Sequence, residues 1–186
     1  MTSPQIIILG GPNGAGKSTL SRLTELSGLL FLNADDIEKD QGAGPLKAGK
    51  TLLAQLREAA ADRKDFVIET TLAGKWLVSH LTSFREQGYQ IHIMYVWIAN
   101  DDIAVARVAS RVRSGGHNIP EDVIRRRYGR GIKNFWYAYA PLSDTWKVYD
   151  NSDIPHVLVA AKEADSGIAV YDPERWRAIE EQITDE

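Results

Sequence analysis

The sequence predicts a three-layer α/β fold with a mainly parallel sheet. Short apolar runs alternate along the chain with segments of helical periodicity, which is the pattern of repeated strand–helix units. The first run, in residues 5–10, contains an unbroken Ile-Ile-Ile-Leu, which is typical of a strand buried on both faces. With 186 residues, of which 44% are hydrophobic, the chain has the size and composition of one domain spanning residues 1–186.

The expected elements follow one another in this alternation. Strands are predicted at residues 5–10, 29–33, 66–69, 90–98, 146–149 and 156–161. Helices are predicted from residue 17 or 18, at 46–63, at 73–87, from 100 or 101 to 113, from 121 to 139, and from residue 173 onward. Pro173 supports the last of these, because proline is favoured in the first turn of a helix.

Composition excludes several classes of site. Cysteine is absent, which rules out disulfides, thiolate metal sites and a cysteine nucleophile. The sequence contains no apolar run of membrane-spanning length and no visible targeting segment, so we expect a cytoplasmic protein with no membrane partner. The net charge of −3 argues against a long nucleic acid as the ligand, although it does not exclude one.

A phosphate-binding motif follows the first strand. Residues 11–18 match G-x-x-x-x-G-K-[ST] between a strand and a helix, which is the P-loop or Walker A pattern. The predicted nucleotide-binding residues are Gly11, Pro12, Asn13, Gly14, Ala15, Gly16, Lys17, Ser18 and Thr19. Glycines let backbone N–H groups turn toward phosphate oxygens, and the helix adds the positive end of its dipole. We therefore expect ATP or GTP here, with Lys17 at the β- and γ-phosphates and Ser18 as a Mg²⁺ ligand.

Asp35 follows the second predicted strand. Ligands of parallel α/β sheets lie beyond the carboxyl ends of the strands, so this carboxylate is placed to meet an acceptor near the γ-phosphate. It would orient an acceptor hydroxyl and take up its proton. The alternative is an N-cap for a helix starting near Ile37, a role that Asp36 suits equally well.

Glu69 ends the third predicted strand, where a Walker B pattern would have aspartate. It can hold a magnesium-bound water or accept hydrogen bonds from substrate hydroxyls. The alternative is a polar strand end in which Thr71 or a neighbour caps the next helix.

A basic segment at about residues 107–134 is predicted to form a lid. Eight basic and two acidic residues between Arg107 and Lys133 give it a charge of +6 and leave −9 for the rest of the chain. Two glycines in its central loop would serve as a hinge. Arginines bond phosphate bidentately and stabilise transferring phosphoryl groups, so the segment favours a small anionic ligand. For Arg125 and Arg126 a solvated charged face is an equal alternative. His117 is interpreted as a hydrogen-bonding loop residue, and no metal other than Mg²⁺ is expected.

With these residues in place, the chain resembles the zeta-toxin-like P-loop kinases, especially short stand-alone members often described as ABC-type ATPases. The matching blocks are GPNGAGKST, FLNADDI, VIETTLAG, RVASRVRSGGHNIPEDVIRRRYGRGIKN and VYDNS. The resemblance implies a fold of the nucleotide- and shikimate-kinase type. It implies Asp35 as general base, Glu69 and Thr71 as substrate-binding residues, and Arg111 and Arg127 as catalytic lid arginines beside Lys17. An inhibitory antitoxin protein is the partner that the family implies.

The leading hypothesis is an ATP- and Mg²⁺-dependent kinase acting on a hydroxyl of a small anionic metabolite. The founding zeta toxins phosphorylate a UDP-amino sugar, but this chain is shorter and lacks the extended elements that help to bind it there. One alternative is a nucleotide or polynucleotide kinase, in which the basic segment holds a nucleic-acid end. Another is a nucleotide-dependent switch or partner-binding ATPase without transfer chemistry.

Overall fold

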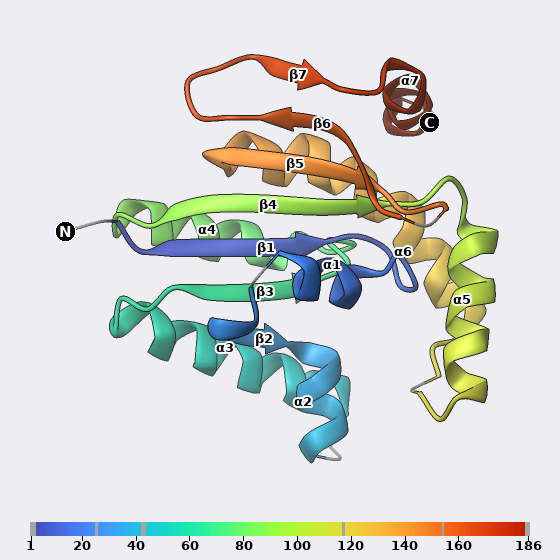
Figure 1. Ribbon diagram of the computed structural model, residues 1–186. Helices are drawn as coiled ribbons and strands as arrows, with labels where there is room; N and C mark the ends of the chain where they lie inside the picture. Colours follow the sequence, from blue (N-terminus) through green and yellow to red (C-terminus); the bar gives the residue numbers. More distant parts are fainter. Residues whose placement is uncertain (1–2, 25, 42–43, 117, 154, 185–186) are drawn as a thin grey trace.

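The protein is described by a computed structural model covering residues 3–24, 26–41, 44–116, 118–153 and 155–184 (Figure 1). These residues form a seven-stranded sheet in the order β2-β3-β1-β4-β5-β6-β7. The strands are β1 (Gln5–Gly10), β2 (Leu30–Asn33), β3 (Phe66–Thr70), β4 (Gln90–Trp97), β5 (Thr145–Asp150), β6 (Val157–Lys162) and β7 (Ile168–Val170). The pairings among β1 to β5 are parallel, whereas β6 and β7 are added antiparallel. The mainly parallel sheet is therefore confirmed.

Helices cover both faces of this sheet, which makes the three layers predicted from the sequence (Figure 1). The α-helices are α1 (Lys17–Leu23), α2 (Ala34–Gln41), α3 (Pro45–Ala61), α4 (Trp76–Glu86), α5 (Asp101–Arg113), α6 (Glu121–Asn134) and α7 (Pro173–Thr184). Shorter helical segments are η1 (Leu26–Gly28), η2 (Phe135–Tyr139) and η3 (Ala140–Leu142). None of the helices within the described ranges is long and apolar enough to cross a membrane.

The core consists of two buried clusters, one on each face of the sheet. Successive side chains of a strand point to opposite faces, so Ile8 of β1 packs with α3, α4, η2 and α7 while Leu9 packs with α1 and α5. Helix α6 contributes Ile132 to the first cluster and Ile124 to the second. It is thereby fixed at the carboxyl ends of the strands, where Figure 1 shows it beside α5 beyond the arrowheads of β1 and β4.

Two features differ from the sequence prediction. Strand β7 was not expected, because its three residues Ile168–Val170 are exposed on an edge strand and carry no burial pattern. Helix α2 begins at Ala34 rather than near Ile37. Asp35 and Asp36 therefore lie in its first turn, where carboxylates are stabilised by the positive end of the helix dipole.

Candidate nucleotide-binding and phosphoryl-transfer site

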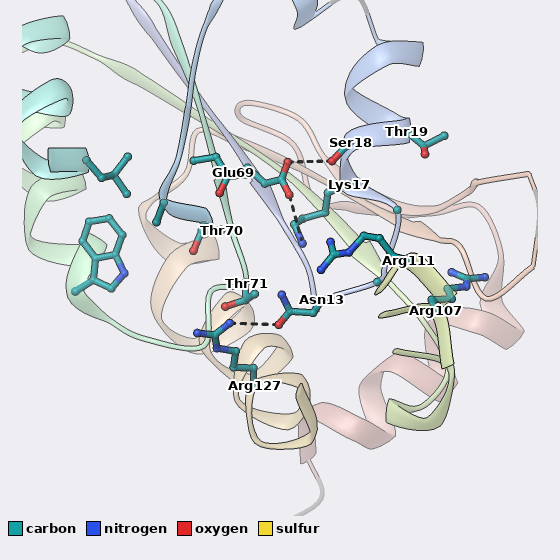
Figure 2. A pocket seen from close by; sticks show the side chains of 16 residues that line it. Asn13, Lys17, Ser18, Thr19, Glu69, Thr70, Thr71, Arg107, Arg111 and Arg127 are labelled. Atoms are coloured by element: carbon teal, nitrogen blue, oxygen red, sulfur yellow. Dashed lines mark hydrogen bonds and ion pairs between the residues drawn. The ribbon is translucent and has the colours of Figure 1, made fainter. Parts of the chain in front are cut away.

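A cavity of about 400 Å³ opens at the carboxyl ends of the parallel strands (Figure 2). Its lining comes from the loops after β1 and β3, the ends of β2 and β3, and helices α1, α2, α3, α4, α5 and α6. Ligands of open parallel sheets bind at this edge, and the volume lies within the range of small-molecule sites. The cavity therefore brings together segments that the sequence analysis identified separately.

The loop after β1 has the backbone of a phosphate cradle. Gly11, Gly14 and Gly16 have φ angles of 138°, 76° and 91°, which side-chain-bearing residues rarely adopt. A Cβ on Gly11 would also collide with the carbonyl oxygen of Val96. Gly16 precedes α1 without a side-chain cap, so the first N–H groups of the helix remain available to an anion. These glycines are thus required by the geometry of the loop as well as by its function.

Lys17 lies folded over this loop and is only 7% exposed. Its Nζ donates hydrogen bonds to the carbonyl oxygens of Gly11 at 2.9 Å and Pro12 at 3.1 Å, and it lies 3.8 Å from Oε1 of Glu69. A triphosphate entering the cavity would offer the ammonium group anionic oxygens in exchange for these neutral carbonyls. The Lys17 side chain is therefore held where the sequence predicts that β- and γ-phosphates bind.

Glu69 connects the P-loop to the end of β3. Its partners in the neighbouring strands are Leu9 of β1 and Asn33 of β2, which places it centrally at the sheet edge. Its Oε2 accepts a hydrogen bond from Oγ of Ser18 at 3.4 Å (Figure 2). A serine hydroxyl beside one carboxylate suits Mg²⁺, which completes its shell with waters and phosphate oxygens. In the described ranges no three His, Cys, Asp or Glu residues cluster as a metal site, so a cage built from protein side chains is not seen there.

We predict that Glu69→Gln will weaken the binding of the Mg²⁺ that accompanies the nucleotide. The amide keeps the shape of the side chain but removes the negative charge beside Ser18, so the half-saturating Mg²⁺ concentration should rise about tenfold. A fluorescent ATP analogue titrated with MgCl₂ measures this. Glu86→Gln, on the exposed end of α4, is the matched control. An unchanged Mg²⁺ titration in the Glu69 variant would show that Glu69 does not contribute to Mg²⁺ binding.

Asp35 is the second residue of α2, and its backbone lies directly beyond the end of β2. Its two predecessors, Asn33 and Ala34, line the cavity, whereas the Asp35 side chain lies outside what the structure describes. The role of Asp35 as a base thus stays a prediction based on its place in the chain. The alternative role of Asp35, as the N-cap of a helix that begins near Ile37, is wrong, because α2 begins at Ala34.

Three arginines of the predicted lid line the cavity, and they differ in what they contact. Arg111 of α5 extends toward Lys17, whereas Arg107 extends the other way (Figure 2). Arg107 donates hydrogen bonds to the carbonyl oxygens of Asn151 at 2.7 Å and Ser152 at 2.9 Å, so it holds the loop after β5. Arg127 of α6 reaches the side-chain oxygen of Asn13, a P-loop residue, at 3.5 Å.

The other basic residues of the segment have different surroundings. Arg125 pairs with Glu121, Asp101 and Asp102, which ties the start of α6 to the start of α5 on the surface. These contacts support the interpretation that Arg125 belongs to a solvated charged face. Arg126 and Arg130 are exposed and do not line the cavity. His117 lies outside the described residues.

The glycines of the central loop end α5. The Gly115 N–H bonds to the carbonyl of Val112 and the Gly116 N–H to that of Arg111, both at 2.9 Å. Gly115 has a φ of 86°, and a Cβ on Gly116 would lie 2.6 Å from Cγ of Arg111. In the structure these glycines therefore serve as a helix terminus packed against Arg111.

The segment after β3 is anchored to α6 and η2. Asn134 Nδ2 donates to the carbonyl of Leu72 at 2.8 Å, and the Tyr139 hydroxyl donates to that of Gly74 at 2.6 Å. Burial raises the pKa of the Tyr139 phenol to about 12, so it remains a donor at neutral pH. Gly131 permits the close approach, since a Cβ there would lie 2.7 Å from the carbonyl oxygen of Thr71. The predicted substrate-binding residue Thr71 lines the cavity from this anchored segment.

Sequence reasoning gave no site role to five lining residues: Asn33, Ala34 and Thr70, which adjoin predicted site residues, and Leu52 of α3 and Trp76 at the start of α4, which do not. Leu52 was assigned to the core because of its helical spacing, and it is indeed 3% exposed. Trp76 belongs to no recognisable motif, although a tryptophan a few residues after a polar strand end was the available signal.

Comparison with known proteins adds the family and the fold. Residues 6–130 match the protein family described as AAA domain. An uncharacterized protein from Haemophilus influenzae is 30% identical over 123 residues, covering 63% of this chain and 88% of that protein. Residues 6–130, which the family model matches, contain the P-loop, the end of β3 and the three cavity-lining arginines of the predicted lid.

Solved structures with low sequence identity share the fold. A chain of the AvrRxo1-ORF1:-ORF2 crystal structure with ATP has a TM-score of 0.74 at 15% identity, covering 95% of this chain and 63% of that one. The present chain thus spans less than two thirds of that protein. A chain of the PezAT chromosomal toxin-antitoxin system of Streptococcus pneumoniae has a TM-score of 0.64 at 15% identity, with 98% and 87% covered. A gluconokinase from Sinorhizobium meliloti has a TM-score of 0.50 at 16% identity, with 81% and 84% covered.

Proposed function

Because the chain belongs to the AAA domain family and has a P-loop kinase-like fold, we propose that it is a phosphotransferase. In this proposal it binds ATP with Mg²⁺ and transfers the γ-phosphoryl group to a hydroxyl of a small anionic metabolite. The carrying observation is that a single cavity joins the phosphate cradle to the residues at the ends of β2 and β3 and to three arginines from α5 and α6. Hydrolysis alone would not require the extra space beyond the cradle.

In this proposal each side chain has a role. Lys17 would exchange the loop carbonyls for the β- and γ-phosphates, and Ser18 and Glu69 are the residues that would hold Mg²⁺, which would neutralise phosphate charge. Arg111 and Arg127 approach from α5 and α6 and neutralise the charge of the transferring group. Asp35 accepts the proton of the acceptor hydroxyl, and Thr71 contacts the acceptor from the anchored segment after β3.

Within this class we propose membership of the zeta-toxin-like kinases. Support comes from the sequence blocks quoted above and from the likeness of fold to the PezAT chain. A role as a toxin, with an inhibitory antitoxin protein as partner, follows from that assignment. A UDP-amino sugar is then one candidate acceptor among nucleotide-like metabolites.

A screen of metabolite extracts tests the proposal. Purified protein is incubated with Mg²⁺, ATP and fractionated extract, and products heavier by one phosphoryl group are sought by mass spectrometry. We expect at least one such product with the wild-type chain and none with Lys17→Ala. Phosphorylation of oligonucleotide ends, with strong salt dependence, would instead indicate a polynucleotide kinase. ATP binding without any transfer product would favour the nucleotide-dependent switch.

A further inference from the structure

Trp76 gives the cavity an aromatic wall. It is the first residue of α4, lines the same cavity as Lys17 and Glu69, and is 42% exposed. The other four tryptophans lie elsewhere: Trp97, Trp146 and Trp176 are at most 7% exposed, and Trp136 packs against the last two. Trp76 is therefore the tryptophan that presents indole surface to the cavity.

The indole stands on a rigid platform. Gly74 lies directly beneath it, since a Cβ there would come within 3.3 Å of Cδ1 of Trp76. The carbonyl of Gly74 is held by the Tyr139 hydroxyl at 2.6 Å. Leu72, two residues before Gly74, has a φ of 55°, a strained conformation for a branched residue, while its side chain is 1% exposed in the core. Strain of this kind persists where the surrounding structure fixes the chain, and here Asn134 and Tyr139 hold the carbonyls of Leu72 and Gly74 in the segment that leads to Trp76.

The cavity therefore has two chemically different parts. Lys17, Arg111 and Arg127 supply positive charge suited to phosphates, whereas Trp76 and Leu52 supply apolar surface. Phosphate groups gain nothing from an indole face, but a flat aromatic ring stacks on one with favourable energy. Building on the kinase function proposed above, we infer that Trp76 determines acceptor specificity by stacking on an aromatic ring, so the acceptor is an alcohol that carries such a ring.

Aromatic alcohols, compared with alcohols that lack an aromatic ring, test this inference without knowledge of the natural acceptor. The full chain is saturated with a non-hydrolysable ATP analogue and Mg²⁺, so that nucleosides cannot enter the donor site. Adenosine, uridine and 1-phenyl-1,2-ethanediol are then titrated while tryptophan fluorescence is followed. Ribose and myo-inositol, which offer hydroxyls without an aromatic ring, are the controls. We expect saturable quenching by at least one aromatic alcohol and none by the controls.

Variants assign the signal to its residue. Because both variants remove the fluorophore, their affinities are measured by calorimetric titration of the probe: Trp76→Ala should weaken binding at least tenfold, while Trp76→Phe should keep most of the affinity. Tyr171→Ala, an aromatic that is 58% exposed away from the cavity, should bind the probe like the wild type. Equal binding by ribose, equal affinity in Trp76→Ala, or no quenching by any aromatic probe would each overturn the inference.

The outcome is separable from that of the kinase proposal. If the extract screen yields a phosphorylated product without an aromatic ring, the kinase function stands and the role of Trp76 is refuted. If the probes quench Trp76 while no extract gives a product, the stacking site stands and the kinase function fails. ATP affinity should be unchanged in Trp76→Ala, because Trp76 lies on α4 and the phosphate cradle on α1 and the loop before it.

Discussion

Lys17→Ala should abolish phosphoryl transfer and strongly weaken ATP binding. Lys17 is buried in the P-loop. Among the described residues, no other lysine lines the cavity. Loss of its charge-assisted bonds to phosphate would reduce ATP affinity about 10- to 150-fold. Turnover should fall further, by about a thousandfold or more, because the charge is needed most as the γ-phosphoryl group departs.

Calorimetric titration with Mg²⁺ and ATP gives the affinity, and product formation with the active extract fraction gives the turnover. Lys64→Ala is the matched control, since Lys64 pairs with Asp62 on the surface before β3 at the opposite end of the sheet. A thermal melt of each variant shows whether the fold is retained. Wild-type affinity and turnover in Lys17→Ala would refute the assignment of the P-loop.

The parts of the site that depend on local sequence could be predicted. The cradle is one continuous segment, and its backbone has positive φ angles at Gly11, Gly14 and Gly16, which glycine adopts readily. Glu69 ends an apolar run, and in a parallel sheet that end lies at the same edge as the end of the first strand. Both inferences need only the strand–helix alternation and the common direction of the strands.

Other parts depend on contacts between distant residues and leave no local pattern. Arg107 and Arg111 share a helix face, yet only the position of the loop after β5 decides that Arg107 bonds to Asn151 and Ser152. The close approach of Gly131 to Thr71 joins positions 60 residues apart. The three-carboxylate environment of Arg125 requires α5 and α6 to pack start to start, which charge counts alone could not indicate.

The basic segment shows how this changes an interpretation. As a sequence it predicts a mobile flap, since two glycines separate two arginine-bearing helices. In the structure, Ile132 and Phe135 are buried in the core, Asn134 bonds the segment after β3, and the glycines close the end of α5. Arg127 is thus delivered to the P-loop by a helix that is already anchored, which favours a site organised before nucleotide binds.

Asp35→Asn should separate chemistry from binding. Asparagine has nearly the same shape and still hydrogen-bonds, but it cannot take up a proton from an acceptor hydroxyl. If Asp35 is the general base, ATP affinity should stay within about threefold of wild type while turnover falls about 100- to 10,000-fold. Calorimetry and single-turnover product formation with the active extract fraction measure the two quantities on the same preparation.

Asp36→Asn is the control that the chain itself provides. Both residues belong to the first turn of α2, where a negative charge is favoured by the helix dipole, so each substitution removes one such charge. Asp36 is exposed, whereas Asn33 and Ala34, the two residues before Asp35, line the cavity. Equal losses in the two variants would mean that the charge serves the helix rather than the reaction. Wild-type turnover in Asp35→Asn would remove Asp35 as the base, because the reaction would then proceed without its proton acceptor.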